Sequence, residues 1–368
     1  MYINFWYPVC LTDELTADAP LRVQILGVRL AAFRDTEGDP HVLADTCVHR
    51  GGSLGKGKVI GSHLACPYHG WRFDGAGKCA HIPVLGEDDT IPARAKVDSY
   101  PVIERYGIVF AFLGDLPEDE RPPPLDVPQW DQPGWRANEL VVFELNGYFE
   151  RSIENGLDPS HNEFVHDLQG NVKLKPETIR VTSSDWGTDI TIGAVPPDLN
   201  TLQYGHLRND DKPSTFGAST AHHGPNTLIT TIRLSDENIF VQYFFEQPID
   251  DHRTRIFFIN MRNCMLEPEH DKKLMNHNLR IAEEDIRLVE ELNPVRTPES
   301  STKEILITGD ECIGAYRKHL KSWEERGWRI DLQALNETAG DIAYAIPSPD
   351  RPGGKNWVLD TIPLMHDR

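Results

Sequence analysis

The chain has 368 residues, of which 39% are hydrophobic, and a formal net charge of −20 at pH 7. This length suggests two domains of ordinary size, and the negative charge argues against nucleic acid as a partner, because phosphates would be repelled. No apolar run approaches the roughly 18–20 residues of a membrane span, and the first residues lack a signal-peptide pattern. We therefore expect a cytoplasmic protein without membrane contact.

The first part of the chain, residues 1–118, predicts a domain of short β-strands. Residues 23–33 indicate a hairpin that turns at Gly27, and residues 106–113 indicate a buried strand. The following stretch, residues 119–134, is rich in proline and acidic residues, so we expect an extended linker.

Two pairs of metal-binding residues lie in this first domain. The sequences Cys47-Val48-His49 and Cys66-Pro67-Tyr68-His69 are separated by sixteen residues. Two thiolates and two imidazoles are the ligand set of a Rieske [2Fe–2S] cluster, in which two histidines replace two cysteines on one iron. A structural zinc site is the alternative, but zinc fingers usually pair cysteine with cysteine and histidine with histidine. The mixed pairs favour the cluster.

The second part, residues 135–336, predicts a mixed domain, followed by a tail over residues 337–368. Residues 195–226 read as a long polar loop, which is typical of a functional segment. Strands are expected at 140–145, 179–183, 188–194, 227–234, 239–247 and 254–262, and helices at about 153–167, 268–292 and 310–325.

A second group of polar residues lies at the start of this domain, in the pattern Asn155-x2-Asp158-x2-His161-x4-His166. Residues five apart are separated by about 140° on an ideal helix, so the two histidines would not share a face. An irregular turn at Asp158-Pro159 could bring them together, because proline disfavours the helical conformation in its predecessor. The alternative is a capped helix start with two incidental histidines.

In this order and at this separation, the two motifs resemble those of the Rieske non-haem iron oxygenases, over essentially the whole chain. The resemblance implies an α+β protein. An N-terminal all-β Rieske domain would precede a helix-grip (START-like) catalytic domain, with an antiparallel sheet and a long C-terminal helix. It also implies that a downstream carboxylate completes the iron site. The implied cluster ligands are Cys47, His49, Cys66 and His69, and the implied iron ligands are His161, His166 and that carboxylate.

The long helix offers a candidate for the carboxylate. Asp285 falls in a mostly apolar stripe of this helix, where a charge is costly unless it is paired or binds a metal. Glu284 falls on the polar face, and Glu283 is the second choice. We therefore predict Asp285 as the third ligand, which would leave open positions for oxygen chemistry.

Two nearby residues receive roles from spacing and resemblance. Asp158 lies three residues before His161 and could accept the second N–H of its ring. In the family this aspartate also bonds a cluster histidine of the neighbouring subunit, here His69, which implies a homotrimer. Asn155 would lie near the iron.

The resemblance implies the terminal oxygenase of a system that hydroxylates or demethylates a small, ring-containing organic substrate. Electrons would come from NAD(P)H through a separate flavin/iron–sulfur reductase or a ferredoxin, because the chain lacks a GxGxxG fingerprint and a second, four-cysteine cluster motif. The Asp-Pro-Ser-His motif favours a monooxygenase or demethylase over a ring cis-dihydroxylating dioxygenase. A Rieske electron carrier or ligand sensor is the alternative from another class.

Overall fold

The structure, a computed structural model, describes residues 1–86, 89–166, 173–195, 217–235 and 237–365. Two compact units divide the chain, one formed by residues 1–124 with 323–368 and the other by residues 125–322. The last segment, which the sequence divided at residue 336, belongs from Trp323 onward to the first unit. No helix among the described residues is both long and apolar enough to cross a membrane.

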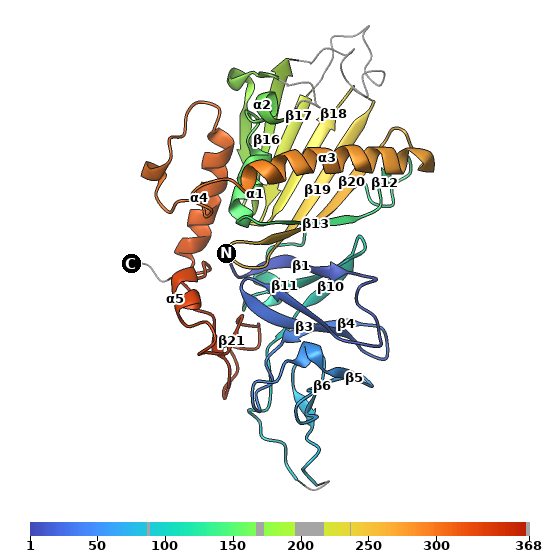
Figure 1. Ribbon diagram of the computed structural model, residues 1–368, viewed down its shortest axis with the longest axis vertical. Coiled ribbons are helices and arrows are strands. Elements are labelled where there is room, and N and C mark those ends of the chain that lie inside the picture. The colour runs from blue at the N-terminus through green and yellow to red at the C-terminus, as the bar shows by residue number, and fades with distance from the viewer. Residues whose placement is uncertain (87–88, 167–172, 196–216, 236, 366–368) are drawn as a thin grey trace. The chain divides into compact units, whose positions relative to one another are not determined.

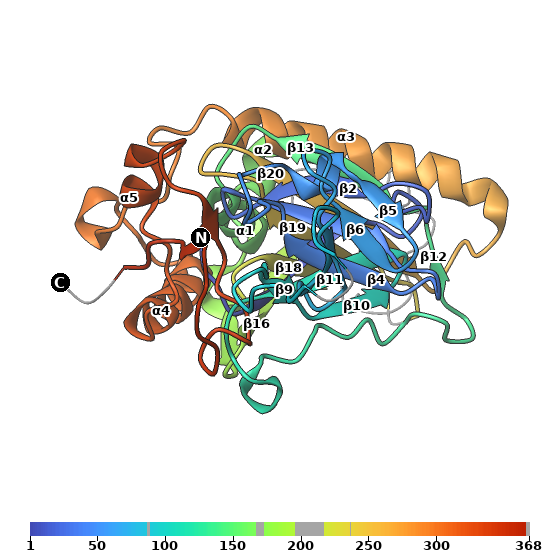
Figure 2. The same ribbon diagram turned by 90° about the horizontal axis from the view of Figure 1, so that it is seen from below.

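The first unit is built from short antiparallel strands, as the sequence predicts (Figure 2). They form three small sheets, in the orders β1-β11-β10, β2-β3-β4-β9 and β5-β6-β7-β8. All six residues of the apolar strand β11 are buried. The strands are β1 (Phe5–Leu11), β2 (Leu21–Ile25), β3 (Val28–Arg34), β4 (Pro40–Ala44), β5 (Lys58–Ile60), β6 (His63–Ala65), β7 (Arg72–Phe73), β8 (Cys79–His81), β9 (Ser99–Tyr100), β10 (Val102–Arg105) and β11 (Ile108–Leu113).

The C-terminal segment packs within this same unit. It contains helix α5 (Leu332–Glu337) and a parallel pair of strands, β21 (Tyr344–Ala345) and β22 (Asp360–Thr361). The carboxylate of Asp98, which is fully buried, accepts hydrogen bonds from Ser348 at 2.8 Å and from the guanidinium of Arg351 at 2.7 Å. The segment predicted as a tail is therefore held by buried polar contacts.

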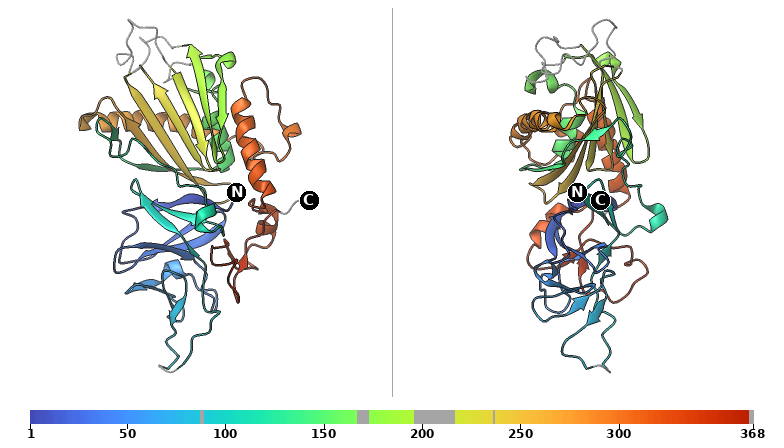
Figure 3. Two further views of the ribbon diagram at one scale, coloured as in Figure 1. Left: turned by 180° about the vertical axis from the view of Figure 1, so that it is seen from behind. Right: turned by 90° about the vertical axis from the view of Figure 1, so that its right-hand side faces the viewer.

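The second unit contains a nine-stranded antiparallel sheet, in the order β12-β20-β19-β18-β17-β16-β14. Strand β13 also pairs with β20, and β15 with β16. Helix α3 crosses one face of this sheet (Figure 1), and the view from behind shows the strands in front of it (Figure 3). The strands are β12 (Arg136–Ala137), β13 (Val141–Leu145), β14 (Lys173–Leu174), β15 (Arg180–Ser183), β16 (Gly187–Val195), β17 (Gly217–His223), β18 (Thr227–Arg233), β19 (Ile239–Pro248) and β20 (Thr254–Arg262).

The long helix touches the sheet near both of its ends. Leu274 packs with Phe240 of β19, and Val289 packs with Leu145 and Ile256 of β13 and β20. The region between these two contacts is left for a cavity. The α-helices of this part of the chain are α1 (Phe149–Leu157), α2 (Asn162–Val165), α3 (Asp271–Val289) and α4 (Glu311–Glu325). Its short 3₁₀ turns are η4 (Pro176–Thr178), η7 (Pro268–His270) and η8 (Ser301–Lys303), and the first unit has two more, η1 (Leu54–Lys56) and η2 (Glu118–Glu120).

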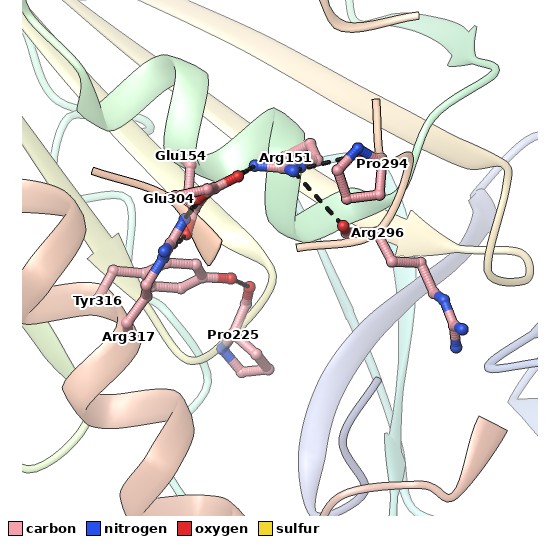
Figure 4. A network of polar contacts seen from close by, with 8 residues as sticks. All are labelled: Arg151, Glu154, Pro225, Pro294, Arg296, Glu304, Tyr316 and Arg317. Carbon is pink, nitrogen blue, oxygen red and sulfur yellow. Dashed lines mark hydrogen bonds and ion pairs between the residues drawn. The ribbon is translucent and has the colours of Figure 1, made fainter. Parts of the chain in front are cut away.

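An ion-pair network ties helix α1 to α4 and to the segment between α3 and α4 (Figure 4). The guanidinium of Arg317 donates to both oxygens of Glu154, at 2.6 and 2.8 Å, and to Glu304 at 2.6 Å. Arg151 donates to the other oxygen of Glu304 at 2.7 Å. Glu154 is only 7% exposed, so its charge depends on these arginines. The network fixes α1, which leads into the candidate metal ligands.

Arg317→Met is expected to lower the free energy of unfolding by about 3 kcal/mol, because Glu154 would lose its bidentate partner while it stays buried. Urea unfolding of the two proteins measures the difference. Arg287→Met is the matched control, since Arg287 has a 79% exposed side chain and lies 3.8 Å from Glu283. That change should stay within about 0.5 kcal/mol. Equal effects of the two substitutions would contradict a structural role for the network.

Candidate metal centres

The two cluster motifs lie on two loops with the same backbone turn. The first loop follows β4, and the second joins β6 to β7. The N–H of Gly51 donates to the carbonyl of Cys47 at 2.9 Å, and that of Gly70 donates to the carbonyl of Cys66 at 3.0 Å. Both glycines have the left-handed backbone conformation, with φ of 73° and 71°. Glycine adopts this conformation readily. The chain therefore presents both motifs in matching geometry.

The predicted cluster ligands gather between these loops. The rings of His49 and His69 have their centroids 4.4 Å apart, and Trp71 stacks on His49 at 4.5 Å. A Cβ atom on Gly52 would lie 2.8 Å from Sγ of Cys66, so any larger residue at position 52 would clash with this sulfur atom. The loops bring the two halves of the motif together, as the sequence predicts.

The candidate cluster ligands differ in burial between the thiols and the imidazoles. Cys47 and Cys66 are nearly fully buried, whereas His49 and His69 are exposed. Burial raises the pKa of the Cys47 thiol to about 12. A thiolate at this position therefore requires a bound metal, which deprotonates a coordinating thiol. The two exposed imidazoles would be the cluster ligands that an electron donor can reach from solvent.

The histidines of the second motif meet at a break between two helices. Helix α1 ends at Leu157, and Asp158 is extended, with φ −83° and ψ 111°, because Pro159 follows it. His161 then precedes α2, and His166 ends it with φ −107° and ψ 76°. This confirms the irregular turn that the sequence predicts and explains how residues five apart can face one point.

His161, His166 and Asp285 form a group of three potential ligand atoms. Nε2 of His166 lies 3.2 Å from Nε2 of His161 and 3.2 Å from Oδ1 of Asp285, and Nε2 of His161 lies 3.5 Å from that oxygen. Ligands about 2.1 Å from a metal and at right angles to each other lie about 3 Å apart. The three atoms are therefore spaced as one face of a metal coordination shell, which leaves the other positions open.

The hydrogen bonds of the two rings leave these nitrogens available. Nδ1–H of His161 donates to the backbone carbonyl of Asp158, and Nδ1–H of His166 donates to Oε2 of Glu284 at 2.9 Å. Each Nε2 then keeps its lone pair. Burial would raise the pKa of the Asp285 carboxyl, but the two imidazoles hold that pKa well below its usual range. The group has the donor set and the charge of a divalent iron site.

The structure places Asn155 and Asp158 beside these atoms, with contacts that refine the predicted roles. The amide of Asn155 donates to Oδ1 of Asp285 at 2.9 Å, so it orients the carboxylate. Asp158 accepts the His161 N–H through its backbone carbonyl, and its carboxylate accepts the N–H of Ser160 at 2.7 Å. The expected carboxylate–His161 contact is therefore a backbone contact.

A cavity of about 290 Å³ opens beside the three ligands, between helix α3 and the sheet. Phe240, Phe244 and Phe258 line it together with residues of α1 and α3. His222 does not line the cavity and is only 2% exposed, with its ring packed beside that of His319. Of the predicted loop at 195–226, residues 217–223 form strand β17, and residues 196–216 lie outside the described residues. The volume suits a small organic molecule.

Glu284, which the sequence places on the polar face of the helix, contacts a candidate metal ligand. Its carboxylate instead holds His166 by the hydrogen bond described above, and burial of the Glu284 side chain is substantial, with 27% exposed. Burial would lower the pKa of His166, but Asp285 and Glu284 outweigh this effect and raise it. Such a contact fixes the orientation of a metal-bound imidazole and increases its basicity.

Glu284→Ala is expected to weaken iron binding about 10- to 100-fold, the usual cost of losing a partner of a metal-bound histidine. Competition with a chelator measures the dissociation constant of the mononuclear iron, and thermal unfolding of the metal-free protein tests for a purely structural effect. Glu283→Ala serves as the control, because Glu283 has a 62% exposed side chain. Unchanged iron affinity in Glu284→Ala would show that Glu284 does not position His166.

Two family profiles match the chain. The Rieske [2Fe-2S] domain matches residues 5–101, and the vanillate O-demethylase oxygenase C-terminal domain matches residues 145–326. The first match contains both cluster motifs, and the second contains His161, His166 and Asp285. Each profile therefore covers one of the two candidate metal centres, in the order that the sequence predicts.

Several known proteins with similar sequences are oxygenases or demethylases by name. The 3-chlorobenzoate-3,4-dioxygenase oxygenase subunit of Comamonas testosteroni is 33% identical over 167 residues, which are 44% of this chain and 37% of that protein. Methylxanthine N3-demethylase NdmB of Pseudomonas putida is 28% identical over 327 residues, which are 86% of this chain and 87% of that protein. The match thus spans less than half of the first relative and most of the second.

Solved structures show the same fold. Dicamba monooxygenase bound to 3,6-dichlorosalicylic acid superposes with a TM-score of 0.72 at 25% identity, over 87% of this chain and 97% of that one. NdmB of Pseudomonas putida also gives a TM-score of 0.72 at 25% identity, over 88% of this chain and 91% of that one. The chain belongs to the Rieske non-haem iron oxygenases, a family that uses a [2Fe–2S] cluster and a mononuclear iron.

Proposed function

We propose that this protein is a terminal oxygenase that hydroxylates or oxidatively demethylates a small organic substrate with O2. The observation that carries the proposal is the group of His161, His166 and Asp285, whose open side adjoins a largely apolar cavity. An electron carrier or ligand sensor would need the cluster motif but not this group. NdmB, a demethylase by name, aligns with most of the chain and supports the same assignment.

Each protein group has a defined task in this proposal. Cys47, Cys66 and the two cluster histidines would hold the [2Fe–2S] cluster, which supplies single electrons. His161, His166 and Asp285 would hold the iron, where O2 is activated beside the substrate. Asn155 and Glu284 keep the carboxylate and His166 in place. The apolar walls of the cavity exclude water and hold the substrate.

The proposed reaction balances with two electrons from a separate reductase. For a methyl group on oxygen or nitrogen, X–CH3 + O2 + 2 e⁻ + 2 H⁺ gives X–CH2OH + H2O, and the hydroxymethyl product separates into X–H and formaldehyde. A ring dihydroxylation would instead place both oxygen atoms in one product, with no formaldehyde. A flavin/iron–sulfur reductase or a ferredoxin, charged by NAD(P)H, is the proposed electron donor. The reducing cytoplasm is the proposed compartment, and the six cysteines support it, because two belong to the cluster motif and the other four lack the spacing of a disulfide framework.

Iron analysis and product analysis test the proposal together. The oxygenase should bind about three iron atoms per chain, whereas an electron carrier would bind about two. With a surrogate reductase and a panel of methyl ethers, N-methyl heterocycles, aromatic acids, steroids and alkaloids, O2 uptake should accompany formaldehyde or an alcohol product. Two iron atoms per chain and no substrate-dependent O2 uptake would contradict the assignment.

A further inference from the structure

Strand β19 presents a row of alternating residues to the cavity. Phe240, Gln242, Phe244 and Glu246 all line it, at the two-residue spacing that puts side chains on one face of a strand. Glu246 is only 1% exposed. A glutamate in such a place is unusual, because a buried charge needs a partner.

The Glu246 side chain has one hydrogen bond. Its Oε1 accepts the hydroxyl of Ser152 at 2.6 Å, and its Oε2 is buried with no hydrogen-bond partner among the described residues. Two hydrogen bonds with Asn226 hold the Glu246 backbone. The Glu246 N–H donates to the Asn226 backbone carbonyl at 2.8 Å, and the Asn226 side-chain amide donates to the Glu246 carbonyl at 3.0 Å. The unpartnered oxygen is therefore fixed in position.

This carboxyl is largely neutral at pH 7. Burial raises its pKa to about 8, and the hydrogen bond from Ser152 lowers it only in part. Because the Ser152 hydroxyl donates to Oε1, the proton of the neutral acid lies on Oε2. Glu246 therefore carries an O–H group that no described protein atom accepts.

No cation compensates Glu246 within the described lining of the cavity. That lining contains no lysine or arginine. Helix α1 packs against β19, but its charged residues bond to other groups. Arg151 and Glu154 belong to the network of Figure 4, and Glu150 accepts a hydrogen bond from the Tyr148 hydroxyl. Arg255 of β20 lies over the ring of Phe257. The other titratable groups that line the cavity are Asp158, His161, His166, His277 and Asp285.

A second unpartnered donor lines the same cavity. The Gln242 amide donates to Oδ1 of Asn278 at 3.4 Å, and Nδ2 of Asn278 is buried without a partner among the described residues. Gln242 and Glu246 lie four residues apart on β19, a separation of about 13 Å along the strand. Two donors in a largely apolar cavity complement a molecule with acceptor atoms, such as carbonyl oxygens or ring nitrogens.

We propose that Glu246 is a specificity-determining residue that donates a hydrogen bond from Oε2 to an acceptor of an uncharged substrate and rejects organic anions. An anion would lose its hydration in a cavity whose described lining includes the Asp158 carboxyl and offers no lysine or arginine to compensate the charge. An uncharged amide, lactam, imide or nitrogen heterocycle would satisfy the Glu246 and Asn278 donors. This inference rests on the proposed oxygenase function, because it names the substrate class of the same cavity.

The test compares two probes of the same size, 4-methoxybenzamide and 4-methoxybenzoate, by calorimetry on the iron-loaded protein without O2. At about pH 7 the wild type should bind the uncharged amide at least tenfold more tightly than the anion, the effect of about one hydrogen bond and one repelled charge. Between about pH 7 and about pH 9.5, affinity for the amide should fall roughly tenfold as Glu246 loses its proton, with a midpoint near its pKa of about 8.

Variants assign the effect to Glu246. Glu246→Gln keeps an uncharged donor, so its affinity for the amide should not change with pH. Glu246→Leu should lose about tenfold affinity at pH 7, whereas the control Glu283→Gln on the exposed face of α3 should behave as the wild type. An infrared difference spectrum, wild type minus Glu246→Gln, should show a carboxylic acid C=O band at pH 7 that disappears above its pKa.

Several outcomes would overturn the inference. They are equal affinity for the two probes, no binding of the amide, affinity that does not depend on pH in the wild type, and a carboxylate band for Glu246 at pH 7. Binding and infrared spectra need no turnover, and the iron content is measured separately. A failure of this inference is therefore distinguishable from a failure of the proposed oxygenase function.

Discussion

Asp285→Ala is expected to lose about one iron atom per chain and all oxygenation, while the cluster stays visible and reducible. The substitution removes the only carboxylate among the three ligand atoms of the described group. Two neutral imidazoles alone bind iron weakly, because the carboxylate supplies the compensating charge. Iron analysis, the visible spectrum of the cluster and its reduction by dithionite measure the three properties on one sample.

Glu283→Ala is the control for this experiment, since Glu283 is the carboxylate that the sequence ranks second. Its side chain is 62% exposed and lies 3.8 Å from Arg287 on the outer face of α3. The variant should keep its full iron content and its activity. Loss of iron from Glu283→Ala, with retention in Asp285→Ala, would show that the third ligand has been assigned to the wrong residue.

The sequence predicts the metal centres better than it predicts their surroundings, for a physical reason. Ligand spacing is a local property of the sequence. The sequence alone therefore predicts the cluster motif from Cys47 to His69 and the histidine pair His161 and His166. Helical periodicity points to Asp285 as the third ligand, and the structure places its carboxylate 3.5 Å from Nε2 of His161 and 3.2 Å from Nε2 of His166. The partner of each histidine depends on where a distant helix packs. The Glu284–His166 bond joins residues 118 positions apart, and no local pattern indicates it.

Strand β17 shows the same limit for the fold. Its sequence, Gly-Ala-Ser-Thr-Ala-His-His, has small and polar residues and no strong alternation, so it reads as loop. It forms a strand because it lies between β16 and β18, where neighbouring strands satisfy its backbone groups. Strands β18, β19 and β20, which are rich in β-branched and aromatic residues, lie within one residue of their predicted bounds.

Electron transfer between subunits is the last expectation, and it begins with two inactive proteins. Cys66→Ser should abolish the cluster absorbance, because one buried thiolate ligand is lost, while it leaves the mononuclear iron in the other domain. His161→Ala should lose the mononuclear iron and keep the cluster. We expect neither variant alone to oxygenate a substrate. Absorbance, iron analysis and O2 uptake on each purified variant establish this baseline. Retained cluster absorbance in Cys66→Ser would contradict the ligand assignment.

We propose a homotrimer in which His69 of one subunit meets Asp158 of the next, as the family resemblance implies. A head-to-tail interface of this kind closes into a ring. Asp158→Asn should leave both metal centres loaded and the cluster reducible. It should nevertheless slow electron delivery to the iron, because the Asp158 side chain would lose the negative charge that we propose accepts the His69 N–H of the next subunit. Single-turnover experiments with a pre-reduced cluster measure that rate directly.

Mixed oligomers of the two inactive chains provide the decisive measurement. In a trimer that contains both Cys66→Ser and His161→Ala subunits, some interfaces would join an intact cluster to an intact iron site. If electrons cross between subunits, part of the activity should return, although no single chain has both centres. Two different affinity tags, used in sequence, isolate the mixed trimers and prove their composition. Mixed trimers that stay inactive would show that electrons do not cross the interface. They would also contradict the proposed role of Asp158 as a bridge between the two metal centres.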